Sequence, residues 1–592
     1  MIRPWEAGIA PTGNANISSL EREFNALVSE LSGLMQSLKK ASGAGEGYDG
    51  NCGCPAPSQE LYAPRAHFID PIRVGHASFW PFGGPSETSE TLNDWFEGRK
   101  NRTDYLKAFI PTGGCFNPLT STAPGQPLQR LFDPSLGRDR LHDPSLPGAR
   151  EISNAVVKQD RDIRDSKGLS DLFWGWGQFI DHDLTLVKTD PGQRADIPVP
   201  RGDPAFDPQG RGDVTIPFER SRTTSGIAGV GDPVNVITGL MDGSMVYGSS
   251  AEETNGLRSF EGGRLRTSAG NLLPTDADGR FVAGDERVNE QPGLTSLHTI
   301  FMREHNRIAD KISAANPKMS DEQVFQNARK IVTSEIQSIT YNEYLPLLLG
   351  SDKAGRMLPP SGKINPQISN AFATAAYRFG HSMVNSNIPI TDANGNVRNV
   401  ALRDAFENPD LIKQGGVDGV LRGQSGQVAQ ALDPFIVEDL RSALFGAPGA
   451  GGLDLAALNI QRGRDHGLPS WNDARESMGL RRITSFNDPI FPPHIAQKLA
   501  SVYDHPDQVD MWIGGLAEQP RGNALVGETF GYLIADQFSR TRAGDPNFYE
   551  WSLDPQTANW VHNVRLADII RWNTDIRDID RTAMIATDNN YW

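Results

Sequence analysis

Three polar side chains fall on one face of a predicted helix in the segment Trp174–Leu186 (WGWGQFIDHDLTL). Gln178, Asp181 and His182 are spaced i, i+3 and i+4, so an α-helix aligns an amide, a carboxylate and an imidazole. The next residue, Asp183, is turned about 100° away from that face. An imidazole in such a group can move protons near pH 7, although a buried, hydrogen-bonded histidine explains the Asp-His-Asp motif alone equally simply.

A second polar group lies in residues 287–296 (RVNEQPGLTS). Arg287 and Glu290 are three positions apart, Gln291 follows, and Pro292 then resets the chain. A fixed guanidinium can stabilise negative charge that develops during a reaction. The alternative is that Arg287 and Glu290 simply pair with each other.

Two later segments repeat this spacing, YRFGH at 377–381 and ALNIQRGRDHG at 457–467. The first sets Arg378 and His381 three positions apart on an apolar helix, and the second does the same for Asn459 and Arg462. A lone histidine on an apolar face is usually a satisfied core residue, so the pattern alone does not make His381 a ligand.

Three further histidines have simpler explanations. His298 and His305 lie seven positions apart on one helix face, a spacing that could suggest a metal pair, but we expect them to pack in the core. His466 follows an aspartate in RGRDHG, and we expect it to be structural too.

Helical periodicity dominates the chain from about residue 149, and strand signals are few and short. Loops rich in Gly, Asp and Pro connect the segments. The sequence therefore predicts a mainly α fold with few short strands and long loops. The expected helical segments are 169–187, 294–315, 319–348, 366–384, 434–445, 454–463, 472–478, 492–503, 523–539 and 562–571.

The chain divides into three predicted regions. Residues 1–45 contain an amphipathic helix at 17–40, which we expect to dock on the main body rather than on another subunit. Residues 46–148 are rich in Gly and Pro and are expected to wrap the surface, and residues 149–592 form the main helical domain. The three cysteines, Cys52, Cys54 and Cys115, allow at most one disulfide and are expected to be loop cysteines rather than metal ligands.

The composition excludes several classes of partner. The 592 residues include 57 Lys and Arg against 73 Asp and Glu, a net charge of −16, with 38% hydrophobic residues. An acidic chain repels phosphate backbones, so no nucleic-acid partner is expected. No apolar run approaches the roughly 20 residues of a transmembrane helix, so no membrane span is expected either.

Taken in order, WGQFIDHD, REHNR, RFGH and ALNIQRGRDHG resemble the motifs of the animal haem peroxidase family, the group of myeloperoxidase, lactoperoxidase and peroxidasin. The match extends from about residue 149 to at least Trp512. The resemblance implies a helical fold around a buried haem b, with residues 149–592 as the catalytic domain. The scarcity of cysteine suggests a microbial relative, and the family favours an extracellular location although no signal peptide is seen.

The resemblance also assigns roles around the haem. His182 looks like the distal histidine that moves the peroxide proton, Arg287 like the distal arginine and Gln178 like their polar neighbour. His381 looks like the proximal iron ligand. Asn459 resembles the residue that accepts a hydrogen bond from the other nitrogen of that imidazole, and Arg378 and Arg462 would pair with the haem propionates.

Two carboxylates match the residues that in this family become ester-linked to haem methyl groups, namely Asp181 and Glu290. The family's strongest chloride oxidiser carries a methionine directly after that glutamate, where this chain has Gln291. We therefore expect bromide, iodide, thiocyanate or phenolic donors rather than chloride.

Asp183 matches a calcium ligand of the family, completed by the loop at 238–244 (TGLMDGS). Calcium takes six to eight oxygen ligands, which alternate residues of a loop can supply. A plain turn with hydrogen-bonded Asp and Ser is the alternative. The expected loop ligands are Thr238, Leu240 through its carbonyl, Asp242 and Ser244.

The predicted function is a haem peroxidase that uses hydrogen peroxide to oxidise a small anionic or aromatic donor through a ferryl intermediate. A first alternative is a fatty-acid dioxygenase of the same superfamily, but its radical tyrosine would stand three residues before His381, where the chain has Arg378, with Tyr377 one place earlier. A second is a calcium-binding adhesive protein that uses the Arg-Gly-Asp tripeptides at 201–203 and 211–213. The oligomeric state is left open.

Overall fold

The computed structural model describes residues 121–586, apart from 138–139, 228, 351–363 and 449. The predicted helix at 17–40, the three cysteines and most of the Gly/Pro-rich region lie outside the described residues. Within them the architecture is mainly helical with four short two-stranded sheets, which confirms the predicted fold class.

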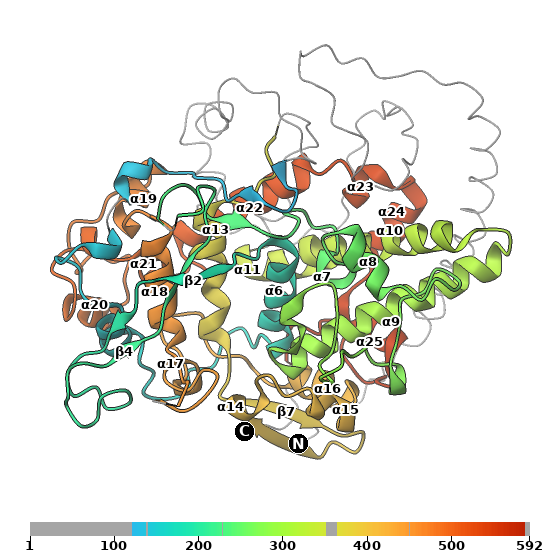
Figure 1. The fold of residues 1–592 in the computed structure, drawn as a ribbon, viewed down its shortest axis with the longest axis horizontal. Helices are drawn as coiled ribbons and strands as arrows, with labels where there is room; N and C mark the ends of the chain where they lie inside the picture. The colour runs from blue at the N-terminus through green and yellow to red at the C-terminus, as the bar shows by residue number, and fades with distance from the viewer. Residues whose placement is uncertain (1–120, 138–139, 228, 351–363, 449, 587–592) are drawn as a thin grey trace, which may run out of the picture. The chain divides into compact units, whose positions relative to one another are not determined.

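Helix α6 (Asp171–Leu184) lies in the middle of the fold and carries the first predicted polar group (Figure 1). It begins after the extended Ser170, with Asp171 in its first turn, and ends where Thr185 becomes extended. It is buried nearly all round, because it packs against α7 (Ser244–Tyr247), α9 (Pro292–Ala315) and α16 (Asp418–Gly426). Its polar side chains are therefore held rigidly.

Two long helices, α9 and α10 (Asp321–Ile339), lie together on one side of α6 (Figure 1). Pro292 stands in the first turn of α9, where its missing N–H costs nothing, and the Gln291 side chain caps that end. Helix α10 continues through a π-helical turn at Thr340–Tyr344 into α11 (Leu345–Leu349), so the predicted 319–348 segment is helical but not uniform.

The predicted helix at 366–384 is wrong as a single element. The structure has α13 (Asn370–Thr374) and a separate 3-10 helix at Ala376–Met383, with Ala375 (φ −128°, ψ −65°) breaking the chain between them. A 3-10 helix repeats every three residues, so Arg378 and His381 are aligned more closely than in an α-helix. The predicted helix at 434–445 is likewise reduced to α17 (Glu438–Arg441).

The other elements are further helices and four pairs of antiparallel strands. The other helices are α5 (Ala149–Ile152), α8 (Ala251–Leu257), α14 (Leu402–Ala405), α15 (Asp410–Gly415), α18 (Leu455–Asp465), α19 (Trp471–Ser477), α20 (Pro493–Ala500), α21 (Met511–Ala517), α22 (Glu528–Gly544), α23 (Tyr549–Ser552), α24 (Pro555–Asn563) and α25 (Leu566–Asn573). The antiparallel strand pairs are β1 (Gln126–Pro127) with β6 (Val234–Asn235), β2 (Thr189–Arg194) with β5 (Glu219–Ser221), β3 (Ile197–Pro198) with β4 (Thr215–Ile216), and β7 (Asn387–Thr391) with β8 (Val397–Ala401).

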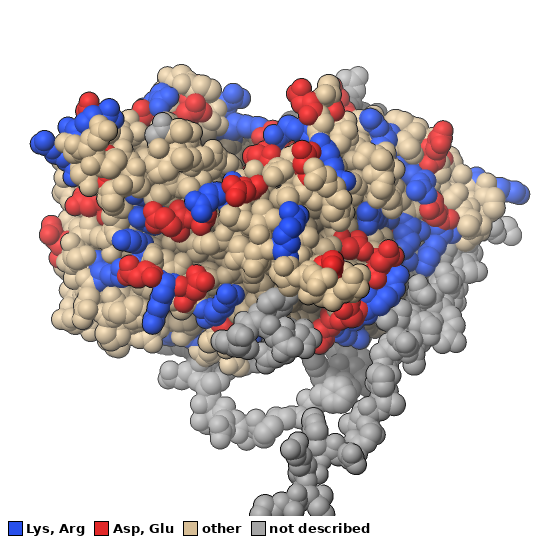
Figure 2. All heavy atoms as spheres, turned by 90° about the horizontal axis from the view of Figure 1, so that it is seen from below, with Lys and Arg blue, Asp and Glu red and all other residues tan. Residues whose placement is uncertain are grey.

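The described surface carries charged side chains of both signs. Figure 2 shows Lys and Arg interspersed with Asp and Glu over the face viewed there. In the described part of the chain no helix is both long and apolar enough to cross a bilayer.

A buried acid of α10, Glu335, lies next to Glu304 of α9. Glu335 is 0% exposed, and neither of its carboxyl oxygens has a hydrogen-bond partner among the described residues. Its neighbour Glu304 accepts hydrogen bonds from Arg307 Nε at 2.8 Å and from Asn573 Nδ2 at 2.6 Å. Burial and the charge of Glu304 raise the pKa of Glu335 well above its ordinary value of 4.5.

The free energy of unfolding is expected to fall less between pH 5 and pH 8 when Glu335 is replaced by glutamine. In the wild type, this group ionises in the unfolded chain near pH 4.5, whereas in the folded chain it keeps its proton to a higher pH. Its contribution is therefore fully present at low pH and declines as the pH rises toward the raised folded pKa. The urea midpoints at pH 5 and pH 8 should lie closer together in E335Q. The exposed Glu252→Gln should leave the wild-type difference unchanged, and an equal difference in E335Q would contradict the assignment.

Candidate functional site

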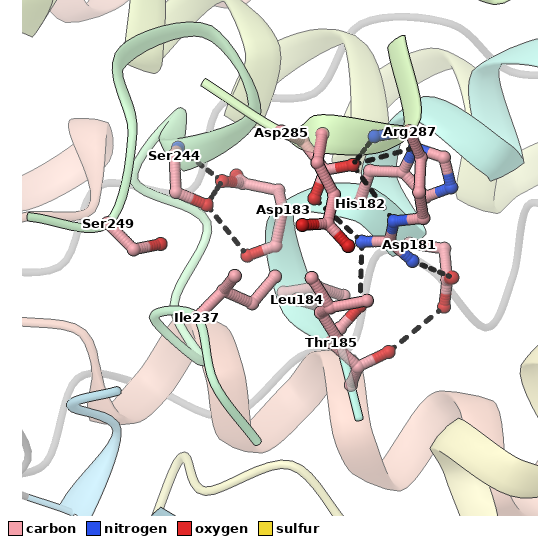
Figure 3. Close-up of polar contacts among 12 residues, drawn as sticks. Asp181, His182, Asp183, Leu184, Thr185, Ile237, Ser244, Ser249, Asp285 and Arg287 are labelled. Atoms are coloured by element: carbon pink, nitrogen blue, oxygen red, sulfur yellow. Dashed lines mark hydrogen bonds and ion pairs between the residues drawn. The ribbon is translucent and has the colours of Figure 1, made fainter. Parts of the chain in front are cut away.

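His182 and Arg287 are brought together by a third residue, Asp285 (Figure 3). Asp285 Oδ1 accepts a hydrogen bond from Arg287 Nε at 2.9 Å, and Asp285 Oδ2 accepts one from Arg287 Nη2 at 2.8 Å. His182 Nδ1 lies 3.6 Å from Asp285 Oδ1. Arg287 Nη2 also donates to the Thr185 carbonyl at 2.9 Å. The Asp285 carboxylate thus binds the guanidinium through two hydrogen bonds and lies next to the imidazole without a hydrogen bond to it.

Asp285 was not among the site residues predicted from the sequence. Asp285 is the N-cap residue of the short helix Glu286–Asn289, and its side chain accepts a hydrogen bond from the Arg287 backbone N–H. Aspartate is a preferred N-cap residue, so the sequence did contain a pattern that could have indicated this role. The suggested pairing of Arg287 with Glu290 is wrong, since Asp285 takes the guanidinium in a two-point contact.

The charges of this group are well defined. Burial, followed by the charge of Arg287, lowers the pKa of His182 well below 6.5, so the imidazole is neutral at pH 7. Burial raises the pKa of Asp285, but Arg287 and its hydrogen bonds outweigh burial and hold that pKa well below its ordinary value. The group therefore combines a neutral base with an ion pair.

Gln178 and Glu290 form the neighbouring part of the site. Gln178 Nε2 donates to Glu290 Oε2 at 2.8 Å, and Gln291 Nε2 donates to Gln178 Oε1 at 3.1 Å. His182 Nε2 lies 3.9 Å from Glu290 Oε2. Burial raises the pKa of Glu290 to about 7, against the opposing effect of Arg287.

These side chains face an accessible space inside the fold. Asp181 and Glu290 side chains are 30% and 28% exposed, and Arg287 is 17% exposed, although α6 is otherwise almost entirely buried. On the opposite element, a Cβ added to Gly380 would meet no atom within 4 Å. The 3-10 helix that carries Gly380 packs against α6. Asp181, Glu290 and Arg287 and, on the neighbouring 3-10 helix, Gly380 are therefore only partly covered by other side chains.

His381 lies on that 3-10 helix and is oriented by Asn459 of α18. The Asn459 amide nitrogen donates to His381 Nδ1 at 2.7 Å, while Asn459 Oδ1 accepts from Arg378 Nη1 at 2.9 Å. The amide is thus turned the other way from the expected orientation, because Arg378 occupies its oxygen. Burial, followed by the charge of Arg378, lowers the pKa of His381 to about 3. Nε2 of this neutral imidazole has no hydrogen-bond partner in the described part of the protein.

Arg462 has partners within the protein. Its Nη1 donates to Ser221 Oγ at 2.8 Å and lies 3.1 Å from Asp465 Oδ2, and its guanidinium stands 4.2 Å above the Phe218 ring. Burial lowers the pKa of Arg462 to about 10. Its side chain is still 16% exposed, so a donor remains for a further anion.

Asp183, one of the predicted calcium ligands, points away from Asp181 and Arg287 (Figure 3). Asp183 Oδ1 accepts from Ser244 Oγ at 2.7 Å, and Asp242 Oδ1 accepts from Thr238 Oγ1 at 3.0 Å. Burial and the charge of Asp242 raise the pKa of Asp183 to about 8. Leu240 is buried in the same loop. Two buried carboxylates that repel each other are the donor set that a hard cation neutralises.

No group of three or more His, Cys, Asp or Glu side chains is placed to bind a metal ion within the described ranges. His305 is hydrogen-bonded to the Tyr247 hydroxyl at 2.9 Å and to the Gly263 carbonyl at 2.8 Å, as a core residue would be. His466 is bonded to Thr374 Oγ1 at 2.7 Å, which agrees with its expected structural role.

The two Arg-Gly-Asp tripeptides differ sharply. Asp203 of the first is fully buried and paired with Arg150 at 2.8 Å, so this tripeptide is not available for cell contact. The side chains of Arg211 and Asp213 in the second are 61% and 77% exposed. The adhesive alternative can therefore use only one of the two.

The model of the animal haem peroxidase family matches residues 112–584. The chain belongs to the animal haem peroxidase family. It is 37% identical to peroxinectin A of Dictyostelium discoideum over 72% of this chain and 85% of that protein, and 33% identical to thyroid peroxidase of Sus scrofa over 68% of this chain and 51% of that protein.

Solved structures give the same result. Peroxidase A from Dictyostelium discoideum superimposes with a TM-score of 0.72 at 33% identity, covering 78% of this chain and 96% of that one. A fatty acid alpha-dioxygenase of Oryza sativa, at 20% identity and a TM-score of 0.69 over 83% of this chain and 92% of that one, shares the fold. The prediction of a peroxidase enzyme is confirmed, and the family implies haem, hydrogen peroxide and a reducing donor.

Proposed function

We propose that this peroxidase oxidises small anionic donors (bromide, iodide and thiocyanate) or small aromatic donors with hydrogen peroxide. The observation that carries the proposal is the pair formed by neutral His182 and Arg287 on Asp285, with the unpartnered Nε2 of His381 on the facing element. Haem bound between these elements supplies the redox chemistry, with peroxide as its oxidant.

The distal group handles the peroxide proton. His182 Nδ1 lies 3.6 Å from the Asp285 carboxylate, and this negative charge favours the tautomer with the proton on Nδ1 and the lone pair of Nε2 toward the site. Nε2 accepts a proton from one peroxide oxygen and returns it to the other, while Arg287 stabilises the negative charge that develops. Gln178 supplies a polar contact through its amide beside Glu290.

The proximal group can respond to iron. Iron held by His381 Nε2 would require the proton on Nδ1, and the Asn459 amide would then have to present its oxygen to that proton. In that orientation Asn459 Oδ1 would no longer be the partner of Arg378 Nη1. We infer that Arg378 and Arg462 then pair with the two haem propionates, as charged donors matched to carboxylates.

Asp181 and Glu290 are proposed as the ester-forming carboxylates, since both are accessible from the same space. A substitution of both, Asp181→Asn with Glu290→Gln, is expected to make the haem fully extractable by acidified organic solvent. The wild-type haem should stay with the protein after this treatment, and each single variant should keep one link, which mass spectrometry of haem peptides detects. Full extraction from the wild type would contradict the ester proposal.

Calcium is proposed at Asp183, Thr238, Leu240, Asp242 and Ser244. The support is the pair of buried carboxylates, Asp183 and Asp242, with two hydroxyl groups in the same cluster. Bound calcium would fix the loop to the helix that carries His182.

The donor class is tested by a pyridine haemochrome spectrum followed by a steady-state panel of bromide, iodide, thiocyanate, chloride, guaiacol and linoleate. We expect a haem b spectrum and peroxide-dependent oxidation of the first three anions or of guaiacol. Because Gln291 is engaged with Gln178 and α9, we expect chloride to be a poor donor. Oxygen uptake with linoleate in the absence of peroxide-dependent activity would favour the dioxygenase alternative.

A further inference from the structure

The Tyr377 ring is the inner end of a chain of aromatic contacts. Tyr377 lies on the 3-10 helix that carries His381, directly before Arg378. Its ring centre is 5.5 Å from that of Phe538 on α22, and the Phe538 ring centre is 5.9 Å from that of Tyr341. All three rings are buried. The chain of contacts therefore begins on the element that carries the proposed haem ligand.

The same chain continues from Tyr341 to the surface. The ring centre of Phe548 lies 5.0 Å from that of Tyr341 and 5.0 Å from each of the rings of Tyr549 and Trp551 on α23. Such distances are those of aromatic rings in direct contact. Helix α23 packs against α10 (Figure 1), and Trp551 is only partly buried. The contacts thus run without a break from the His381 element to solvent.

The Tyr549 hydroxyl, at the outer end of the chain, has a proton acceptor. It lies 2.9 Å from Nδ1 of His562, an exposed residue of α24. The Asn342 amide nitrogen donates to the Tyr549 oxygen at 3.0 Å and lies 3.2 Å from the same His562 Nδ1. Because an amide nitrogen only donates, Nδ1 is an acceptor and Nε2 carries the ring proton. The Glu550 carboxylate lies farther from the hydroxyl, at 3.5 Å.

The charge states of this pair suit proton transfer. Burial, followed by the charge of Arg565, lowers the pKa of His562, so its ring is neutral at pH 7. Burial, followed by the charge of Glu550, raises the pKa of Tyr549 to about 12, so the phenol keeps its proton until it is oxidised. A phenol that has lost an electron is a strong acid, and here a neutral base stands within hydrogen-bond distance of it. Tyr549 can therefore lose an electron and a proton together.

We propose that Tyr549, Trp551 and His562 form an outer oxidation site, at which this peroxidase oxidises phenolic groups that are too bulky to reach the haem. The donor contacts the partly exposed Trp551 and the exposed His562, while Tyr549 holds the oxidising equivalent beneath them. This inference deepens the proposed oxidation of aromatic donors, and it rests on the proposed position of the haem beside His381.

Electrons reach the haem from this site in steps between tyrosines. Tyrosine and tryptophan lose an electron far more readily than phenylalanine, so Tyr341 and Tyr377 carry the electron while Phe538 and Phe548 only bridge them. Tyr341 lies on the π-helical turn Thr340–Tyr344, a rare conformation that frequently marks functional sites.

The steps balance in electrons and protons. Tyr549 loses one electron inward, and its O–H bond breaks as the proton passes to His562 Nδ1. A phenolic donor ArOH then gives one electron and releases its proton to solvent, while the proton on His562 returns to Tyr549. Two such donors, with two protons from solvent, reduce one hydrogen peroxide to two water molecules, and two ArO• radicals leave.

The first test compares one phenol in two sizes on the haem-loaded protein, free tyramine and tyramine coupled to dextran. In Y549F, peroxide-dependent oxidation of the dextran-bound phenol, followed by the fluorescence of coupled phenols, should fall at least about 10²-fold, as for loss of a proton-transfer group. Oxidation of free tyramine, which also reaches the haem, should stay within about two-fold, as for a distant substitution with no shared partner.

Two further variants control this result. His562→Gln keeps a hydrogen-bond acceptor beside the phenol but cannot take its proton, so it should behave like Y549F. Tyr503→Phe removes another buried tyrosine, whose hydroxyl donates to Asp510 at 2.9 Å, and should leave oxidation of both forms of tyramine unchanged. The outer site is overturned if Y549F and H562Q oxidise the dextran-bound phenol at the wild-type rate, or if oxidation of both forms falls equally.

A second measurement needs no donor. With peroxide alone, the wild type should show a tyrosyl radical by electron paramagnetic resonance, and peptide mapping should find oxidation products on Tyr549 and Trp551. Tyr341→Phe keeps the ring contacts but interrupts the electron steps, so these products should fall to the background seen without haem. Equal oxidation of α23 in the wild type and in Y341F would overturn the path.

The outcomes separate this inference from the proposed function. A haem-loaded wild type that oxidises neither free tyramine nor iodide would refute both. Oxidation of free tyramine without oxidation products on α23 would refute the outer site and leave the peroxidase proposal intact.

Discussion

Peroxide activation is expected to slow about 10²–10⁴-fold when His182 is replaced by alanine, the range for loss of a general acid–base group. Haem should remain bound, because His381 and its partner Asn459 lie on other elements. The reason is the neutral imidazole, whose low pKa leaves Nε2 free to accept the peroxide proton at pH 7. Stopped-flow mixing with peroxide, followed at the Soret band, measures the rate, and the haemochrome spectrum measures haem content.

The matched variant is Asp285→Asn, which keeps the shape of the side chain but removes its charge. It should cost about 10–100-fold, as expected for a group that orients another. The loss should be smaller than in H182A, because the imidazole remains. A wild-type rate in H182A would remove His182 from the proton shuttle, and a wild-type rate in D285N would show that Asp285 does not orient it.

Removal of calcium should lower the thermal midpoint and, with it, the rate of peroxide activation. At the proposed site the cation would neutralise Asp183 and Asp242, and uncovering two buried carboxylates would cost about 3–5 kcal/mol, as for a buried ion pair that loses one partner. The effect reaches the site because Asp183 follows His182 on α6. Calorimetry with and without a calcium chelator measures the shift, and elemental analysis measures the bound metal.

Two variants sharpen this test. Asp183→Asn should abolish both the bound calcium and the response to chelator. Asp392→Asn alters an exposed turn, whose carboxylate accepts hydrogen bonds from the backbone N–H groups of Asn394 and Asn396, and should leave the calcium response intact. Purified protein that contains no calcium and does not respond to added calcium would contradict the site.

The helices that carry the site were predictable where the spacing of apolar residues along the chain matches the face that packs in the core. The apolar spacing in 169–187 predicts α6, and 294–315 predicts α9 almost to the residue. The prediction failed at 366–384, where the break at Ala375 has no local signal. There the Trp512 indole donates to the Arg378 carbonyl at 3.3 Å, a contact with a distant helix that no periodicity reveals.

The same division holds for the site itself. Residue order and helical spacing alone determined that Gln178, Asp181 and His182 share a face and that Asp183 leaves it, because these positions depend only on the repeat of the helix. The tertiary structure decided which polar groups from distant segments meet: Asp285 lies next to His182, Arg287 reaches the Thr185 carbonyl, and Arg378 pairs with Asn459. Such contacts join segments up to about a hundred residues apart, and their geometry is fixed by packing, which a linear pattern does not encode.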